Sequence, residues 1–133
     1  MAKKRVLLVD DEKSFTNLLK LNLEDTGQYE VRVENWAEDA LTAAREFKPD
    51  LILLDVIMPG MDGGDVAGQI RNDRHLKGTP IVFLTATVSQ REAGVQGLNS
   101  GGSLFLAKPV SFEQLVNCIN ENASKAASAE SLK

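Results

Sequence analysis

The fold is decided by the stretch LILLDVIMPGMDG, residues 51–63. Its four leading aliphatic residues have the length of a short strand that is buried on both faces, and Pro59-Gly60 and Asp62-Gly63 indicate a loop after it. Asp55 follows the aliphatic run directly. An acid there is poorly placed for packing but well placed for chemistry, because open parallel sheets bind ligands at the carboxyl ends of their strands. Asp55 is therefore the first candidate functional residue.

Four other segments are predicted to be strands. Three are short apolar runs that end on polar residues, which is typical of buried parallel strands. They are Arg5–Val9 before Asp10-Asp11, Ile81–Leu84 before Thr85, and Ser103–Ala107 before Lys108. The segment Tyr29–Glu34 instead alternates apolar and polar residues, which indicates a strand at the edge of the sheet.

Helical patterns separate these strands. Apolar residues at helical spacing predict helices over 12–25 and 64–73, and Ser89 to Glu92 gives a capping box for a helix over about 89–99. Asn35 and Glu38 suggest a capping box for a second helix, and Ser111 to Gln114 caps the last one. The inner stripe expected for the second helix is Ala37, Ala40, Leu41, Ala44 and Phe47.

Strict alternation of strands and helices predicts an α/β fold. Five strand–helix pairs with right-handed crossovers give a doubly wound, five-stranded parallel sheet with helices on both faces. A chain of 133 residues corresponds to about one domain, which we place at 1–122. The remaining segment, 123–133, has little to bury and is expected to be a frayed helix or a disordered tail.

Composition excludes several classes of protein. No apolar run approaches the roughly 20 residues of a membrane helix, and the apolar run after the basic N-terminus is too short for a signal peptide, so we expect a cytoplasmic protein. The net charge of -4 argues against direct binding of nucleic acid. Cys118 is the single cysteine, so no internal disulfide forms.

The predicted sheet gathers five polar side chains at one rim: Asp10, Asp11, Asp55, Thr85 and Lys108. Each of them alone has a simpler reading as a helix cap, a loop acid or a surface residue. Together, however, three carboxylates could not all stay ionised without a cation, and a site with few acids and no histidine suits Mg²⁺. The pattern indicates transfer of a phosphoryl group to Asp55, with Lys108 as a positive charge and Thr85 as a hydroxyl donor.

With these residues the chain resembles the receiver domains of response regulators, in particular the single-domain chemotaxis regulators, over about residues 4–122. The likeness is carried by Asp10-Asp11, by Asp55 in the stretch 51–63, by Thr85-Ala86, and by Phe105 three residues before Lys108-Pro109. It implies the flavodoxin-like strand order 2-1-3-4-5. It also implies a role in two-component phosphorelay signal transduction.

The resemblance assigns a role to each site residue. Asp55 would be the phosphoacceptor, and Mg²⁺ would be bound by Asp10, Asp11, Asp55 and the backbone carbonyl of Ile57, with Asp10 acting through water. Lys108 would pair with the phosphoryl group. The switch would be Thr85, which moves to hydrogen-bond that group, and Phe105, which turns inward and otherwise reads as a plain core aromatic.

The resemblance also implies partners. A sensor histidine kinase or a phosphotransfer protein would donate the phosphoryl group. The fourth helix, fifth strand and fifth helix would then contact a downstream protein. Such a domain catalyses its own phosphorylation and dephosphorylation but turns over no external substrate. Because an aliphatic Ile57 cannot hold a hydrolytic water by hydrogen bonding, we expect slow dephosphorylation.

Three other functions compete with this one. A pseudo-receiver, a protein interaction module that is never phosphorylated, would be expected to lack an acid or the lysine. A nucleotide- or flavin-binding domain would need a GxGxxG or P-loop pattern after a strand, and none occurs. A phosphohydrolase with an aspartate nucleophile usually has a second acid two residues later, where this chain has Ile57.

Overall fold

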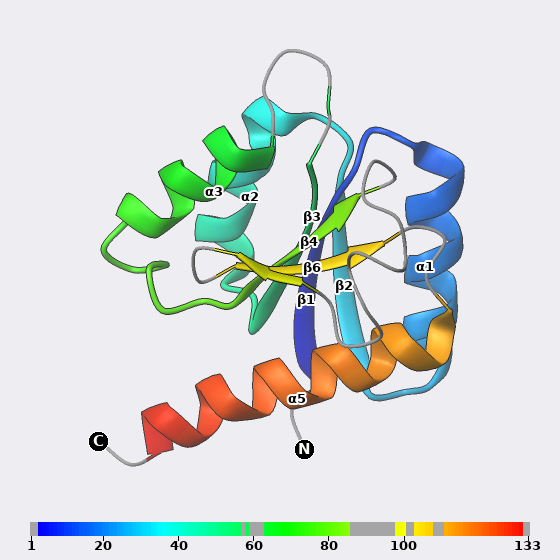
Figure 1. The fold of residues 1–133 in the computed structure, drawn as a ribbon. Coiled ribbons are helices and arrows are strands. Elements are labelled where there is room, and N and C mark those ends of the chain that lie inside the picture. Colours follow the sequence, from blue (N-terminus) through cyan, green and yellow to red (C-terminus); the bar gives the residue numbers. More distant parts are fainter. Residues whose placement is uncertain are drawn as a thin grey trace.

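A computed structural model of the chain describes residues 3–56, 58, 63–85, 98–100, 103–107 and 111–131. Its six strands form one sheet in the order β2-β1-β3-β4-β6-β5 (Figure 1). The strands are β1 (Lys4–Val9), β2 (Tyr29–Glu34), β3 (Leu51–Asp55), β4 (Ile81–Thr85), β5 (Leu98–Ser100) and β6 (Ser103–Ala107). The first five in this order are parallel, which confirms the predicted winding with β2 at the edge.

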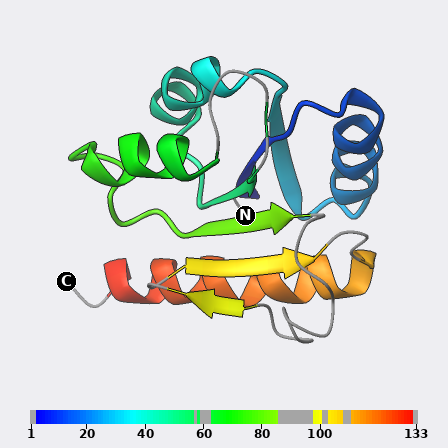
Figure 2. The same ribbon diagram turned by 45° about the horizontal axis from the view of Figure 1, so that its top comes forward.

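Helices cover both faces of this sheet (Figure 2). They are α1 (Lys13–Asp25), the short 3₁₀ helix η1 (Ala37–Asp39), α2 (Ala40–Phe47), α3 (Gly63–Asn72) and α5 (Phe112–Ser131). Alternate residues of each strand pack on opposite faces, as the period of two requires. In β3, Leu51 and Leu53 pack with α1 and α5, whereas Ile52 and Leu54 pack with α2 and α3. No helix in the described part of the chain is long and apolar enough to span a membrane.

The start of the second helix differs from its prediction. No side chain caps it, and the segment begins as the 3₁₀ helix η1 after Trp36. The expected capping box of Asn35 with Glu38 does not form, and the Asn35 Nδ2 donates to the Asp10 carbonyl and the Thr16 hydroxyl. The buried residues of α2 are Ala40, Ala43 and Ala44, and Ala43 was not in the predicted stripe.

The predicted helix over 89–99 is wrong at its end. Leu98–Ser100 is the strand β5, which pairs antiparallel with β6 and adds a sixth strand to the edge of the sheet. The rest of that predicted helix lies outside the described residues. The period-based prediction failed here because three residues are too few to show an alternating pattern.

The last helix begins where the sequence predicts. Ser111 Oγ accepts a hydrogen bond from the Gln114 backbone N–H (3.1 Å), and Gln114 Oε1 accepts one from the Ser111 N–H (3.3 Å), which is a capping box. Asn120 anchors the middle of α5, because its Oδ1 accepts bonds from the hydroxyl of Tyr29 (2.6 Å) and from Lys4 Nζ (3.2 Å). The helix continues to Ser131, so the boundary at residue 122 stays a prediction.

Gly63 lets α3 start directly against the end of β3. Its N–H donates to the Val56 carbonyl (2.7 Å), and a Cβ at this position would overlap the carbonyl oxygen of Asp55 and lie 2.8 Å from the Cα of Val56. Both neighbours are backbone, which cannot swing aside. Glycine is therefore required at this position by close approach.

Two glycine substitutions test this contact. We expect Gly63→Ala to lower the free energy of unfolding by about 1–3 kcal/mol, because the added methyl forces the backbone apart. Gly68→Ala in the same helix is the matched control, since nothing lies within 4 Å of its Cβ position. It should raise stability by roughly 0.5–1 kcal/mol. Urea unfolding measures both, and similar effects of the two changes would contradict the close-approach argument.

Candidate metal and phosphoacceptor site

The register of two parallel strands brings the predicted acids together. Val9 of β1 lies beside Leu54 of β3, so the next residues, Asp10 and Asp55, meet at the carboxyl edge of the sheet. Carboxylate oxygens of Asp10, Asp11 and Asp55 lie within 4.8 Å of one another. Asp10 is fully buried, Asp55 is 7% exposed, and Asp11 faces solvent. The structure thus assembles the three carboxylates that the sequence placed at this rim.

This arrangement favours a bound cation. Two carboxylates about 5 Å apart repel by about 3 kcal/mol at an effective dielectric constant near 20, and burial of two of them reduces screening by water. The donor set contains only carboxylate oxygens, which suits a hard cation. In an octahedral Mg²⁺ site the ligand oxygens are roughly 3–4 Å apart, so a small closure or one bridging water would fit the three acids to the ion.

Hydrogen bonds to the end of β2 and to the start of α1 fix the loop that carries Asp10 and Asp11. The Asp10 N–H donates to the Glu34 carbonyl of β2 (3.1 Å), and Asp10 Oδ1 accepts the Glu12 N–H (2.9 Å). One oxygen of the Asp10 carboxylate is thus oriented by the start of α1. The carboxylate is held in place before any cation arrives.

Asn35 contacts the acidic loop, whereas its sequence position predicts a helix cap. Its Nδ2 donates both to the Asp10 backbone carbonyl (2.7 Å) and to the hydroxyl of Thr16 in α1 (3.1 Å). Thr16 is fully buried, and its hydroxyl donates in turn to the Lys13 carbonyl (3.1 Å). Asn35 therefore connects the end of β2 to the acidic loop. Its position in the sequence could have indicated this contact, because Asn35 directly follows β2, the strand that pairs with β1.

The backbone after Asp55 is fixed as well. The Val56 N–H donates to the Leu84 carbonyl of β4 (3.0 Å), and the Val56 carbonyl accepts the Gly63 N–H described above. Met58 is buried in the core beneath α2 and α3. Asp55 thus sits at the end of a rigid strand rather than in a free loop. Ile57 lies outside the described residues.

The other predicted residues are placed only in part. Thr85 ends β4 and pairs with Ala107 of β6, so its backbone lies one strand away from Asp55, at the same edge. Phe105 of β6 is half-buried, and its ring stacks on Phe83 with centroids 5.0 Å apart. This is a core contact, and its role as a switch remains a prediction. Lys108 lies outside the described residues.

Comparison with known proteins establishes the family. The sequence model of the response regulator receiver domain family matches residues 6–120 of this chain. The chain therefore belongs to the receiver domain family of response regulators. Over 114 residues it is 40% identical to the DNA-binding response regulator MtrA of Mycolicibacterium paratuberculosis. That match covers 86% of this chain but 48% of MtrA, so the chain spans about half the length of this relative.

Solved structures agree with the fold. A CheY-like receiver domain protein from Methanospirillum hungatei superimposes with a TM-score of 0.81 at 27% identity, covering 96% of this chain and 99% of that one. The receiver domain of a sensor histidine kinase from Pseudomonas aeruginosa has a TM-score of 0.76 at 26% identity, covering 92% and 99%. That protein carries a magnesium ion in its active-site cleft.

The role of Asn35 predicts a measurable effect on metal binding. Asn35→Ala removes the bond to the Asp10 carbonyl and the bond to the Thr16 hydroxyl of α1. We expect Mg²⁺ affinity to fall by about tenfold, as for other residues that orient metal ligands. Isothermal titration calorimetry measures the dissociation constant, and circular dichroism checks the fold. Asn17→Ala on the exposed face of α1 is the matched control and should leave affinity unchanged. Equal Mg²⁺ affinity in the two variants would show that Asn35 does not position the site.

Proposed function

We propose that this domain accepts a phosphoryl group on Asp55 from a sensor histidine kinase or a phosphotransfer protein in a Mg²⁺-dependent reaction. The observation that carries the proposal is the convergence of Asp10, Asp11 and Asp55 within 4.8 Å. Asp10, Asp11, Asp55 and the Ile57 carbonyl would hold the ion, and it would neutralise charge on the incoming phosphoryl oxygens. Membership of the receiver family supports the same assignment.

The chemistry follows from the placement of Asp55. One of its carboxylate oxygens attacks phosphorus, and the bond between phosphorus and the donor nitrogen breaks, so that the donor keeps the electron pair and an acyl phosphate forms on Asp55. Lys108 would offer a positive charge to the phosphoryl oxygens, and Thr85 a hydrogen bond. With 7% exposure, Asp55 is reachable from the rim yet largely shielded from bulk water, which limits hydrolysis of the product.

The readout would use the face that carries β6 and α5, together with the predicted helix before them, whose residues 89–97 lie outside the described part of the chain. Thr85 ends the strand that pairs with β6, and Phe105 of β6 stacks on Phe83 of β4, so a change at the phosphoryl group has a short path to this face. We propose that a protein partner binds there, and we do not assign direct nucleic-acid contacts to this domain. MtrA is named as DNA-binding, so in a longer protein the partner surface could be that of an attached domain.

The alternative is a pseudo-receiver, which would bind partners without phosphorylation. It is disfavoured because the acidic cluster is complete in the structure. Maintaining buried like charges has a cost in stability, and a module used only for protein contact has no need of them. Phosphorylation in this scheme is catalysed by the domain on itself, with no external substrate turned over.

Labelling tests the phosphoacceptor directly. The intact protein incubated with acetyl phosphate and Mg²⁺ should gain the mass of one phosphoryl group, and Asp55→Asn should gain none because it lacks the nucleophilic carboxylate. Excess chelator should suppress labelling. Asp25→Asn, an exposed acid at the end of α1, is the control and should be labelled like the parent. No mass gain in the parent would favour the pseudo-receiver, and labelling of Asp55→Asn would place the acceptor elsewhere.

The lifetime of the phosphorylated form is a separate prediction. An aliphatic side chain at position 57 cannot orient an attacking water, so we expect slow hydrolysis and a several-fold faster loss of label in Ile57→Asn. The rate is followed by intact mass after removal of the donor. Ile57→Leu is the control, because it is also unable to hold water. An unchanged rate in Ile57→Asn would refute this account of the lifetime while leaving the acceptor assignment intact.

A further inference from the structure

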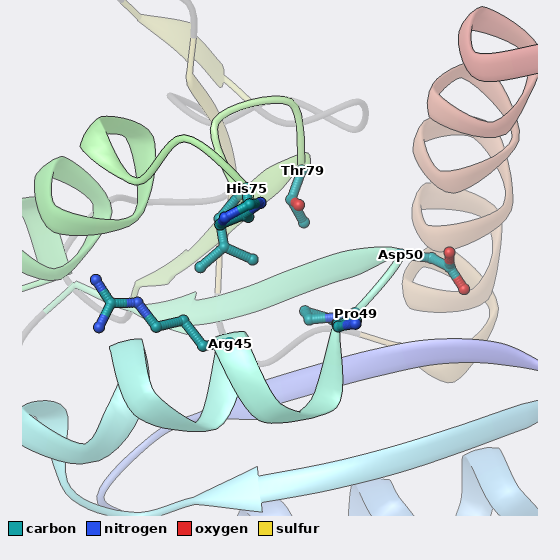
Figure 3. A pocket seen from close by; sticks show the side chains of 7 residues that line it. Arg45, Pro49, Asp50, His75 and Thr79 are labelled. Carbon is teal, nitrogen blue, oxygen red and sulfur yellow. The ribbon is translucent and has the colours of Figure 1, made fainter.

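A pocket of about 590 Å³ lies at the amino edge of the sheet, opposite the acids. One part of its lining comes from the end of α2 and the lead into β3, and the other from the turn between α3 and β4 (Figure 3). The lining residues are Arg45, Lys48, Pro49, Asp50, His75, Leu76 and Thr79. Its volume falls in the range of small-molecule sites. It is separate from the phosphoacceptor site, because the length of β3 lies between them.

Each of the two acids near this pocket accepts a hydrogen bond, Asp73 from a cation and Asp50 from a backbone N–H. Asp73 Oδ2 accepts from Arg45 Nε (2.6 Å), and Asp73 Oδ1 accepts from the His75 N–H (2.9 Å). The hydrogen bond from the Arg45 guanidinium lowers the pKa of the Asp73 carboxyl most, and the bond from the His75 N–H lowers it further. The Asp73 carboxylate therefore stays ionised and paired with Arg45. Asp50 Oδ2 accepts the Arg5 N–H (2.8 Å), and Figure 3 shows its carboxylate pointing away from His75 and Thr79.

The donors, in contrast, are available. Arg45 uses only Nε in its bond to Asp73, so its two terminal nitrogens have no acceptor among the described residues. The same holds for the Lys48 ammonium, the His75 ring and the Thr79 hydroxyl within the described part of the chain. The pocket therefore carries N–H and O–H donors on both of its walls. Arg45 shares its charge with Asp73, and the Lys48 ammonium is a second cation.

The backbone at Lys48 is a second, independent observation. Lys48 ends α2 with φ 54°, and it is the one described non-glycine residue with a positive φ. Helices commonly end in this left-handed conformation, but usually on glycine, because a side chain is strained there. The Lys48 N–H is held by the Ala44 carbonyl (2.9 Å). A lysine thus stands at the pocket in a conformation where glycine is more common, and residues in such conformations cluster at functional sites.

We propose that this pocket binds a small phosphate-bearing molecule. The Arg45 terminal nitrogens, the Lys48 ammonium and the Thr79 hydroxyl would contact the phosphate oxygens. A phosphate suits donors arriving from several directions better than a planar carboxylate does, and arginine pairs well with it. The pocket exceeds the size of a phosphate alone, and the buried Pro49 and Leu76 offer an apolar wall for the organic part.

Inorganic pyrophosphate is a suitable probe. Titration into the ¹⁵N-labelled full chain without Mg²⁺, at constant ionic strength, should give saturable amide shifts at Lys48, His75 and Thr79. Lys48→Asn removes the charge in a residue that tolerates positive φ, so the fold is kept, and it should weaken binding by about tenfold. Lys77→Asn is the matched control. Lys77 is an exposed lysine on the turn that carries His75 and Thr79 but does not line the pocket, so its change should alter affinity less than about twofold.

The outcomes distinguish a specific binding site from nonspecific electrostatic attraction. An absence of saturable shifts would overturn the proposal, because no site would then be present. Equal weakening by Lys48→Asn and Lys77→Asn would also overturn it, because surface charge alone would then account for the binding. Asp55→Asn should bind pyrophosphate like the parent, which keeps this test independent of the phosphoacceptor. Vesicles of phosphatidic acid and phosphatidylcholine should not sediment the protein, since the site is concave. Co-sedimentation that Lys48→Asn abolishes would assign the pocket to a lipid headgroup and overturn the small-molecule proposal.

Discussion

Electrostatic repulsion among three carboxylates is the constraint on which the rest of this structure depends. The β1–β3 register places Asp10 beside Asp55, and the hydrogen bonds of Asn35 and Glu12 keep the acidic loop there. Apolar burial on both sides of β1 and β3 supplies the energy that holds like charges together. A bound cation relieves this repulsion. The fold is therefore poised to respond to charge at one edge.

The two ends of the sheet differ in chemistry because parallel strands all point the same way. The five parallel strands all end at the carboxyl edge, where Asp10, Asp11 and Asp55 gather. The opposite edge is formed by helix ends and by the turns that lead into β3 and β4, and there Arg45 and Lys48 surround the pocket. Charges at the two edges interact weakly, because the length of a strand exceeds the Debye length at physiological salt.

Most of the fold could be predicted because buried parallel strands leave a strong signal. Aliphatic runs such as Leu51–Leu54 have few alternatives, and the polar residues after them identify the rim. Local polar contacts were less predictable. Asn35 satisfies the pattern of a helix cap, but its Nδ2 donates to the Asp10 carbonyl and the Thr16 hydroxyl, which directs the side chain toward the acidic loop. Strand β5 depends on pairing with β6 rather than on its own three residues, so no local pattern could reveal it.

One backbone hydrogen bond explains how the acidic edge can influence the rest of the sheet. The Val56 N–H, directly after Asp55, donates to the Leu84 carbonyl, directly before Thr85. A shift of the Asp55 loop therefore displaces the end of β4 unless this bond breaks. Leu84 packs toward α1 and α5, whereas Phe83 packs on the other face against Phe105. Because tightly packed cores change by discrete rearrangement, a small displacement at β4 can reach both layers of helices.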